Sequence, residues 1–305
     1  MDKIEQNMLQ EIAELDSLPV GAYNIRSNGE SEARNTTANI DIITKEDKSG
    51  LDIKIKDKTK NESVHIPVII SKSGLKETVY NDFFIGDDCD ITIVGGCGIH
   101  NCGSSESRHD GIHRFFVGKN SKIKYIEKHY GEGDGQGKKV MNPTTEVILG
   151  ENSFMDMETS QIAGIDDTIR ITKAVLENGA SLIIHDKILT SGKQRAEAEI
   201  NVDLNGENSS CDIISRGVAK ENSYQKIILG INGNTKCNGH AECDSIIMDH
   251  GIIEAIPQLK ATNVDASLIH EAAIGKIAGE QLIKLMTLGL TEKEAEEEII
   301  QGFLR

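Results

Sequence analysis

The first stretch of the chain has the hydrophobic spacing of a single helix. Four apolar residues recur at intervals of four, four and three positions: Ile4, Met8, Ile12 and Leu15. Residues at these intervals share one face of an α-helix, and acids and amides fill most of the remaining positions. We therefore predict one amphipathic helix over residues 2–16.

Beyond this helix the hydrophobic period changes to two. The clearest alternation of apolar and polar positions runs from Ala196 to Leu204, and a shorter one runs from Leu51 to Lys56. A period of two is typical of strands that bury one face. From residue 38 to about residue 270 the pattern predicts one short strand after another.

A short turn unit recurs immediately before some of these strands. Its copies occupy residues 118–121, 150–153, 177–180, 206–209 and 220–223. The last residues of successive copies are 32, 27, 29 and 14 positions apart, so most copies lie two steps of about 14 residues apart. Such a step favours stacked coils, with Asn or Gly at each tight corner and a small last residue that lets the next coil pack closely. We predict a mainly β protein built as a β-helix; an antiparallel sandwich, whose strands are also short, is the alternative.

The strand pattern ends near residue 275, and the tail becomes helical. One apolar helical face is formed by Leu282, Leu285 and Met286. Gly289 is placed to end this helix, and the capping-box pattern of Thr291–Glu294 starts a second one. The apolar residues of the second helix are Ala295, Ile299 and Phe303. The pair either caps the solenoid or docks a partner, and capping is the commoner use.

The composition excludes several classes of function. The formal net charge is -16 and no basic run stands out, which argues against nucleic-acid binding. Aromatic residues make up 4% of the chain, so stacking platforms for bases or sugars are not expected. No apolar stretch approaches about 18 residues, and the charged first residues do not resemble a secretory signal. We expect a soluble, cytoplasmic protein that contacts no membrane and keeps its six cysteines as thiols.

A first cluster of cysteine and histidine comprises Cys89, Cys97, His100, Cys102, His109 and His113. Thiolate and imidazole at this density could bind zinc, although the spacing is not that of a Cys-x2-Cys knuckle. Alternatively, Cys97 between two glycines is exposed enough to accept and pass on sulfur, with a neighbouring imidazole favouring the thiolate. For Cys89 a small buried side chain in a turn is the simpler interpretation.

A second cluster comprises Cys237, His240 and Cys243, followed by His270 and Glu271. Soft thiolate with imidazole and carboxylate nearby could hold iron, and mixed ligation suits a cluster that is later released. The same residue types could equally form a zinc site, so spacing alone ranks zinc and iron about equally. The sequence contains no phosphate-binding loop, nucleophile elbow or metalloprotease helix. We therefore expect a non-enzymatic protein, with any nucleotide hydrolysis supplied by a partner.

An ordered series of residues in the last third of the chain resembles a known family. The series is Cys243–Ser245, Pro257, His270–Ala272, Gly275–Ile277, Glu280–Leu282, Gly289–Leu290, Glu294–Ala295 and Ile300–Phe303. It resembles the SufB/SufD scaffold family of the SUF iron-sulfur assembly system, and SufB more than SufD. A weaker similarity reaches upstream to Gly96–Cys97, which resembles a glycine–cysteine pair of SufB.

This resemblance implies an architecture and partners. It implies a right-handed parallel β-helix over residues 38–274, preceded by a helical segment (1–37) and followed by a helical segment (275–305) that docks an ABC-type ATPase called SufC. The β-helix ends would mediate dimerisation, as a homodimer or with a SufD-like paralogue, and a donor would supply sulfur. The residues expected to contact the ATPase are Leu282, Leu285, Met286, Ile299 and Phe303.

The resemblance also assigns roles to individual residues. Cys243, Glu271 and His270 fall on the cluster-assembly ligands, and Cys97 falls on the sulfur-accepting thiol. The expected function is a scaffold on which a transient iron-sulfur cluster is assembled. The alternative is a zinc-stabilised β-solenoid that acts as an interaction module, with ligands drawn from Cys97, Cys102, Cys237, Cys243, His100 and His240. A cupin-like metalloenzyme is a weaker alternative because cupin histidine motifs are absent.

Overall fold

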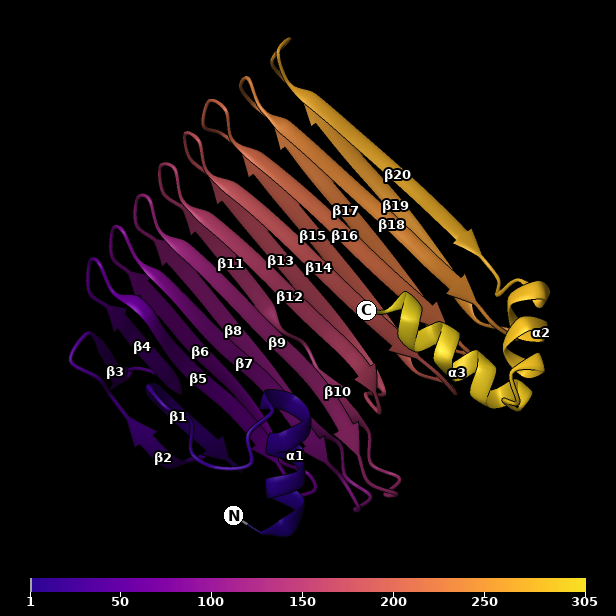
Figure 1. Ribbon diagram of the computed structural model, residues 1–305. Helices are drawn as coiled ribbons and strands as arrows, with labels where there is room; N and C mark the ends of the chain where they lie inside the picture. The colour runs from indigo at the N-terminus through magenta and orange to yellow at the C-terminus, as the bar shows by residue number, and fades with distance from the viewer. Residues whose placement is uncertain (1) are drawn as a thin grey trace.

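The computed structural model describes residues 2–305 and shows a β-solenoid of about eight turns, with one helix before it and two after it (Figure 1). Two sheets face each other and run the length of the solenoid. Sheet A contains, in spatial order, β2 (Glu30–Asn35), β1 (Ala22–Ser27), β5 (Lys60–Ile70), β7 (Asp90–His100), β9 (Lys122–Glu132), β12 (Phe154–Ala163), β14 (Ser181–Thr190), β16 (Ser210–Ala219), β18 (Asn238–Ile247) and β20 (Ser267–Gly275). Sheet B contains β19 (Ile252–Ala261), β17 (Tyr224–Gly233), β15 (Arg195–Leu204), β13 (Asp167–Leu176), β10 (Lys139–Met141) with β11 (Thr144–Leu149), β8 (Ser107–Val117), β6 (Lys76–Ile85), β4 (Gly50–Ile55) and β3 (Ile40–Thr44).

Neighbouring strands within each sheet run parallel along almost the whole solenoid. Strand β14 pairs with β16, and β16 with β18, in parallel and without a register shift. In the described chain, antiparallel pairs occur only at the start, between β1 and β2 and between β3 and β4. The predicted β-helix is therefore confirmed, and the antiparallel sandwich is excluded. Strands begin at Ala22, earlier than the sequence boundary at residue 38.

The alternation of side chains divides each strand into an inner and an outer face. In β15 the buried residues are every second one from Ala196 to Leu204, as the sequence pattern predicted. Apolar inner residues occupy the same register on successive strands of sheet B, for example Phe83, Phe115, Val147, Ala174 and Val202. The rings of Phe83 and Phe115 stack with centroids 4.5 Å apart. These stacks form one continuous core, because identical positions of successive coils lie directly above one another.

The recurring turn unit explains the spacing of the coils. Asn120, Asn152 and Asn208 adopt positive φ angles of 53°, 55° and 60°, which asparagine tolerates better than most residues. The last residue of each copy is fully buried under the next coil. The first four copies precede strands of sheet A, whereas the copy at 220–223 precedes β17 of sheet B. The single step of about 14 residues is therefore the crossing from one sheet to the other.

Helix α1 (Lys3–Ala13) lies on the outer face of sheet A, against β5, β7 and β9 (Figure 1). Two glycines of β7 make this close approach possible. A Cβ atom at Gly96 would lie 2.7 Å from the carbonyl oxygen of Ile12, and one at Gly98 would lie 2.5 Å from Cε of Met8. The predicted helix is confirmed, and it ends a turn earlier than expected, at a left-handed Glu14.

The two predicted C-terminal helices are α2 (Gly279–Thr287) and α3 (Glu292–Phe303). Thr291 and Glu294 form the capping box that the sequence indicated. Helix α3 is tied to the solenoid by Arg216, whose Nη1 donates a hydrogen bond of 2.8 Å to the carbonyl oxygen of Phe303. In the described residues no helix combines the length and apolar character needed to cross a bilayer.

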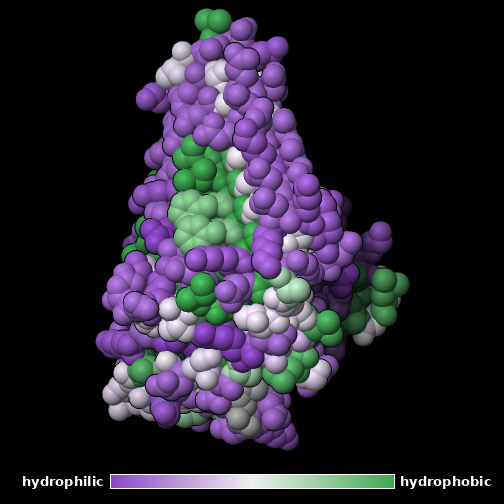
Figure 2. All heavy atoms as spheres, turned by 90° about the vertical axis from the view of Figure 1, so that its left-hand side faces the viewer, coloured by the Kyte–Doolittle hydropathy of each residue, from purple (hydrophilic) through white to green (hydrophobic). Residues whose placement is uncertain are grey.

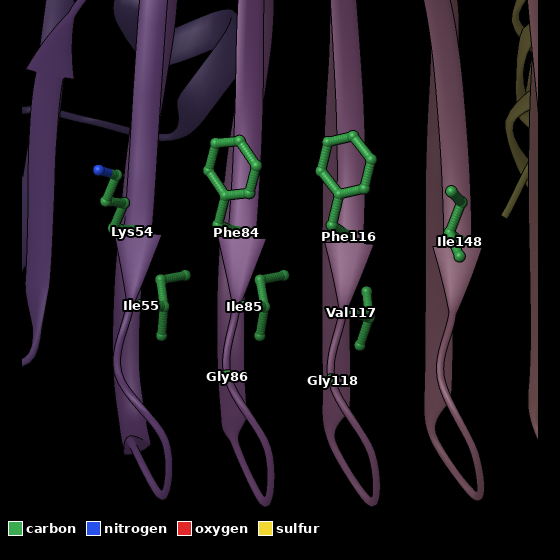
Figure 3. A pocket seen from close by; sticks show the side chains of 9 residues that line it. All are labelled: Lys54, Ile55, Phe84, Ile85, Gly86, Phe116, Val117, Gly118 and Ile148. Carbon is green, nitrogen blue, oxygen red and sulfur yellow. The ribbon is translucent and has the colours of Figure 1, made fainter.

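The outer surface of sheet B carries an apolar stripe. Figure 2 shows an apolar band crossing an otherwise hydrophilic side of the molecule. Phe84, Phe116 and Ile148 occupy one register row, and the two rings stack with centroids 5.2 Å apart beside an open hollow of about 490 Å³ (Figure 3). These side chains point outward, so the stripe is separate from the polar interior described next.

Candidate functional site

The inner face near the start of the solenoid carries a buried cysteine among ionisable groups. Cys97 points inward from β7 and is only 4% exposed, which corrects the expectation that it is accessible. His129 occupies the same register row on the adjacent strand β9, and His109 faces it from β8 of sheet B. Both imidazoles are buried. Parallel stacking thus brings His129, which is distant in the sequence, beside Cys97, and His109 reaches the thiol from the facing sheet.

These imidazoles favour the thiolate form of Cys97. Burial alone would raise the pKa of the thiol, but the positive charges and hydrogen bonds of His109 and His129 outweigh burial and lower it. Burial opposes the charged form of each imidazole too. The thiolate and nearby carboxylates nevertheless raise the pKa of His109 to about 10 and that of His129 to about 9. Two donors beside the sulfur favour its thiolate form, which is the reactive form of a cysteine, and could stabilise the negative charge of a second sulfur atom bound to it.

Two buried carboxylates complete the charge balance. Glu77 accepts a hydrogen bond of 3.0 Å from Nδ1 of His109, and Oε1 of Glu127 lies 3.4 Å from Nε2 of His129. Burial would raise the pKa of Glu127, but His129, His113 and Arg170 lower it to about 2. The sequence analysis missed both carboxylates and His129. These three residues could have been found in the sequence as polar residues at positions where the strand alternation predicts an inward-facing apolar side chain.

A row of polar side chains runs from this cluster along the inside of sheet A to Cys243. From β9 to β18 the row consists of Glu127, Thr159, Asp186, Ser215 and Cys243. Arg170 of sheet B crosses the interior and pairs with Asp186 at 2.6 Å. Several buried polar atoms along this path have no hydrogen-bond partner within the described residues: His129 Nδ1, Gln161 Oε1, Arg170 Nη1, Asp186 Oδ2, Ser215 Oγ, Gln225 Oε1 and Ser245 Oγ. Unsatisfied polar atoms in this number are the mark of an interior that holds water or a polar ligand.

Cys97 and Cys243 are too far apart for direct contact. Their strands, β7 and β18, are separated by five steps along sheet A. At about 4.8 Å per step this is a distance of roughly 24 Å. A sulfur atom passing between the two thiols would therefore have to travel along the polar row.

At the other end of the row, Cys243 lies one strand from the open end of the solenoid. It points inward and is 1% exposed, and burial raises its pKa to about 11. His270 of the edge strand β20 shares this inner face, in register with Ala241, and neither ring nitrogen has a partner in the described structure. Glu271 points to the outer face, in register with Glu242. The structure therefore places Cys243 and His270 on the same inner face, in neighbouring rows of adjacent strands, and puts Glu271 on the opposite face.

The remaining predicted residues lie in different environments. Cys237 is buried in the apolar core, whereas His240 lies on the outer face with Nδ1 2.8 Å from Asp212. Cys89 is buried at a turn, as expected, and its thiol donates to the carbonyl oxygen of Lys56. Cys102 is exposed and contacts His100. Between residues 2 and 305 no three His, Cys, Asp or Glu side chains are arranged to hold a metal ion.

The fold and the interior define a class of protein: a β-solenoid with a row of buried polar groups that runs between two of its buried thiols, Cys97 and Cys243. Comparison with known families then identifies the family of the chain. The family model described as the SufBD core domain, for FeS cluster assembly by the SUF system, matches residues 83–303. The chain therefore belongs to the SufBD family.

Curated relatives come from archaea and bacteria. The iron-sulfur cluster assembly SufBD family protein of Methanocaldococcus jannaschii is 29% identical over 243 residues, covering 79% of this chain and 76% of that protein. The family protein of Archaeoglobus fulgidus is 30% identical over 248 residues, covering 79% of this chain and 65% of that protein. The iron-sulfur cluster assembly protein SufB of Bacillus subtilis is 29% identical over 166 residues, covering 53% of this chain and 36% of SufB.

Proposed function

We propose that this protein is a scaffold on which iron-sulfur clusters are assembled, with Cys97 carrying sulfur and Cys243 binding the nascent cluster. The SufBD family assignment supports a role in iron-sulfur cluster assembly. The observation that carries the finer proposal is the polar inner row between the two thiols. A protein whose interior served stability alone would fill these positions with apolar residues, because unpaired buried polar atoms cost free energy.

In this proposal the cluster around Cys97 stabilises sulfur in an anionic form. A persulfide on Cys97 would be negatively charged, and the imidazolium groups of His109 and His129 would offset that charge. Onward movement would follow the row past the ion pair of Arg170 and Asp186. The buried path would keep reduced sulfur away from bulk water and oxidants.

Cys243 and His270 form the receiving end. Thiolate and imidazole are suitable ligands for iron, and two ligands from one chain leave positions open for sulfide and for other donors. Glu271 sits on the outer face of the edge strand, so it would join them only through a rearranged edge or from another chain at that end. Incomplete ligation fits a cluster that is assembled and then handed on.

The open end of the solenoid is the proposed dimer interface, with a second copy or a SufD-like paralogue. Strands β19 and β20 are the free edges of the two sheets there. Apolar side chains are exposed on these edges: Ile252, Leu259, Ile269 and Ile274. The opposite end is closed by two antiparallel hairpins, and its edge strand β2 carries Glu30, Glu32 and Arg34. Charged edges discourage strand pairing, so the apolar end is the one suited to assembly.

Helices α2 and α3 are the proposed docking element for a SufC-type ATPase, which would supply the ATP hydrolysis. Leu282 faces the hollow between α2 and the ends of β18 and β20, whereas Met286 is exposed. Ile283 and Leu288 are also exposed, which gives α2 and its C-terminal end an outward apolar surface. An apolar surface on a short helix at the edge of a rigid solenoid is suited to binding a partner.

The proposal is tested by anaerobic reconstitution with iron and sulfide, read by visible absorption and by metal analysis. We expect the wild-type chain, with its ATPase, to develop a labile iron-sulfur chromophore, and Cys243→Ala to lose most of it. Cys211→Ala removes another buried thiol from the neighbouring strand and is the matched control. Tightly bound zinc in the wild type, with no chromophore in either protein, would instead support the zinc-stabilised interaction module.

A further inference from the structure

Cys102 is the one exposed cysteine of the six, all of which lie in the described part of the chain. Its Sγ lies 3.0 Å from Nε2 of His100, and Nδ1 of the same ring lies 2.9 Å from Oε1 of Glu132. If His100 donates its Nδ1 proton to Glu132, Nε2 is free to accept the proton of the thiol. A nucleophile, a base and a carboxylate that orients the base are thereby in line.

The stacked coils fix this arrangement. His100 ends β7 and Glu132 ends β9, and the two residues are direct register partners on the outer face. The hydroxyl of Tyr130 donates a hydrogen bond of 3.4 Å to the second oxygen of Glu132. One oxygen of the Glu132 carboxylate is therefore fixed by Tyr130, and the other oxygen orients the His100 imidazole.

The loop that carries Cys102 is also fixed. Asn101 is completely buried, and its amide nitrogen donates to the carbonyl oxygens of Ser105 and Gly137 at 2.9 and 3.0 Å. Gly133 belongs to the loop that stacks on this one, and a Cβ atom there would lie 2.5 Å from the carbonyl oxygen of Asn101. Two loops packed this tightly fix the backbone that carries the thiol.

We propose that Cys102, with His100 and Glu132, is the surface thiol that accepts a sulfane sulfur from a persulfide donor. The inference rests on the proposed function and adds the step that brings sulfur to the protein. Cys97 is poorly placed for that step, since it is buried and packs with Ile99, Met141 and Ile165 in one apolar cluster. A protein-bound persulfide needs a thiol that it can reach, and Cys102 is such a thiol.

The chemistry needs no added oxidant or reductant. His100 Nε2 takes the proton of the Cys102 thiol, and the thiolate attacks the outer sulfur of the donor R–S–SH. The S–S bond of the donor breaks as the new S–S bond forms, which gives Cys102–S–SH and the thiolate R–S⁻. The proton on His100 then passes to this leaving thiolate, while Glu132 stabilises the transient imidazolium.

The test uses glutathione persulfide as the donor with the full-length protein under anaerobic conditions. Persulfide at each cysteine is followed over time by differential alkylation and peptide mass spectrometry. We expect Cys102 to be modified first, with a rate that falls about ten-fold or more in His100→Gln and several-fold in Glu132→Gln. Glu106→Gln removes a charge from the same loop without touching the three residues and should leave the rate unchanged.

Equal rates at Cys102 in the wild type and His100→Gln would overturn the proposal. So would stoichiometric zinc that is lost in Cys102→Ser, because Cys102 and His100 would then be metal ligands. Reconstitution of Cys102→Ser with inorganic sulfide separates this inference from the proposed function, since sulfide bypasses the persulfide step. We expect Cys102→Ser to form a normal iron-sulfur chromophore with sulfide. If the wild type formed no chromophore either, that result would contradict the scaffold proposal and not the role of Cys102.

Discussion

At the scale of single residues, the surroundings of each cysteine determine its chemistry more than its spacing in the sequence does. Cys97 and Cys243 are both almost completely buried, yet the pKa of the first is lowered and that of the second is raised to about 11. The difference comes from the two imidazoles beside Cys97, because Cys243 has a serine neighbour and burial dominates there. The surroundings favour the thiolate form of Cys97, whereas Cys243 stays neutral until a metal or base takes its proton.

Glu127 links this charged cluster to the stability of the fold. Its pKa falls from 4.5 to about 2, so its contribution to folding is present above pH 4.5 and is lost as the pH falls toward 2. We expect Glu127→Gln to lower the free energy of unfolding at pH 7 by on the order of 1–3 kcal/mol and to make the loss of stability below pH 4.5 shallower.

Urea unfolding measured from pH 7 to pH 2 checks this expectation. Glu146→Gln is the control, because Glu146 lies on the outer, exposed face of β11. If the free energy of unfolding fell equally steeply below pH 4.5 in the wild type and in Glu127→Gln, the cluster would not be holding Glu127 ionised.

The sequence could identify the cysteines of the site but not all of their neighbours. Cys97 and His109 stood out as members of a dense cluster, whereas His129 is isolated in the chain and joins them only through the register of β7 and β9. Glu271 illustrates the opposite case. It adjoins His270 in the sequence, but neighbouring residues of a strand point to opposite faces, so one is inside and the other outside.

At the scale of elements, the turns and helix caps were the most predictable features because their signals are local. The asparagine corners depend on the backbone conformation of single residues, and the Thr291 capping box depends on side chains of Thr291 and Glu294 in the same turn. The anchoring of α3 depends on Arg216, which lies 87 positions before Phe303 in the chain. No local pattern could indicate that contact.

Arg216 should control how firmly α3 is held. Its guanidinium bonds to the end of the helix and lies 5.7 Å from the centroid of the Phe303 ring. Removing a charged hydrogen bond typically costs about 1–3 kcal/mol. We therefore expect Arg216→Ala to speed amide exchange in residues 292–303 by about ten-fold or more. Exchange in the solenoid strands should not change. Hydrogen exchange with mass spectrometry measures both regions.

Arg195→Ala is the matched control, since Arg195 lies over the Tyr224 ring on a strand of sheet B. Exchange in α3 that is the same in both variants would show that other contacts hold the helix.

At the scale of the whole molecule, the repeat in the sequence was enough to predict the solenoid but not its polar interior. Each copy of the turn unit specifies a tight corner between the two sheets, and alternating strands between corners leave few other ways to bury the apolar faces. The alternation of apolar and polar positions in the sequence does not determine which inward-facing polar residues meet across the interior. That depends on how the two sheets face each other, as the pair of Arg170 and Asp186 illustrates.

The asymmetry of the solenoid leads to the last prediction. Its first coil is closed by two hairpins, one of which has the charged edge strand β2, whereas in its last coil one edge each of β19 and β20 is unpaired and carries exposed apolar side chains. Ile269 lies on that end and is 51% exposed, while Ile169 is 50% exposed on β13, in the middle of sheet B. If the open end forms the dimer interface, Ile269→Lys should weaken self-association by about ten-fold or more. Ile169→Lys, far from that end, should leave self-association unchanged.

Light scattering after size exclusion, with and without the ATPase, gives the mass of the wild type, Ile269→Lys and Ile169→Lys. We expect dimers for the wild type and Ile169→Lys, and monomers at low concentration for Ile269→Lys. A stable wild-type monomer in the presence of the ATPase would mean that the open end is not closed by a second copy. Cys243 and His270 would then have to hold a cluster beside an exposed edge, and the third donor would have to come from the same chain or from the recipient.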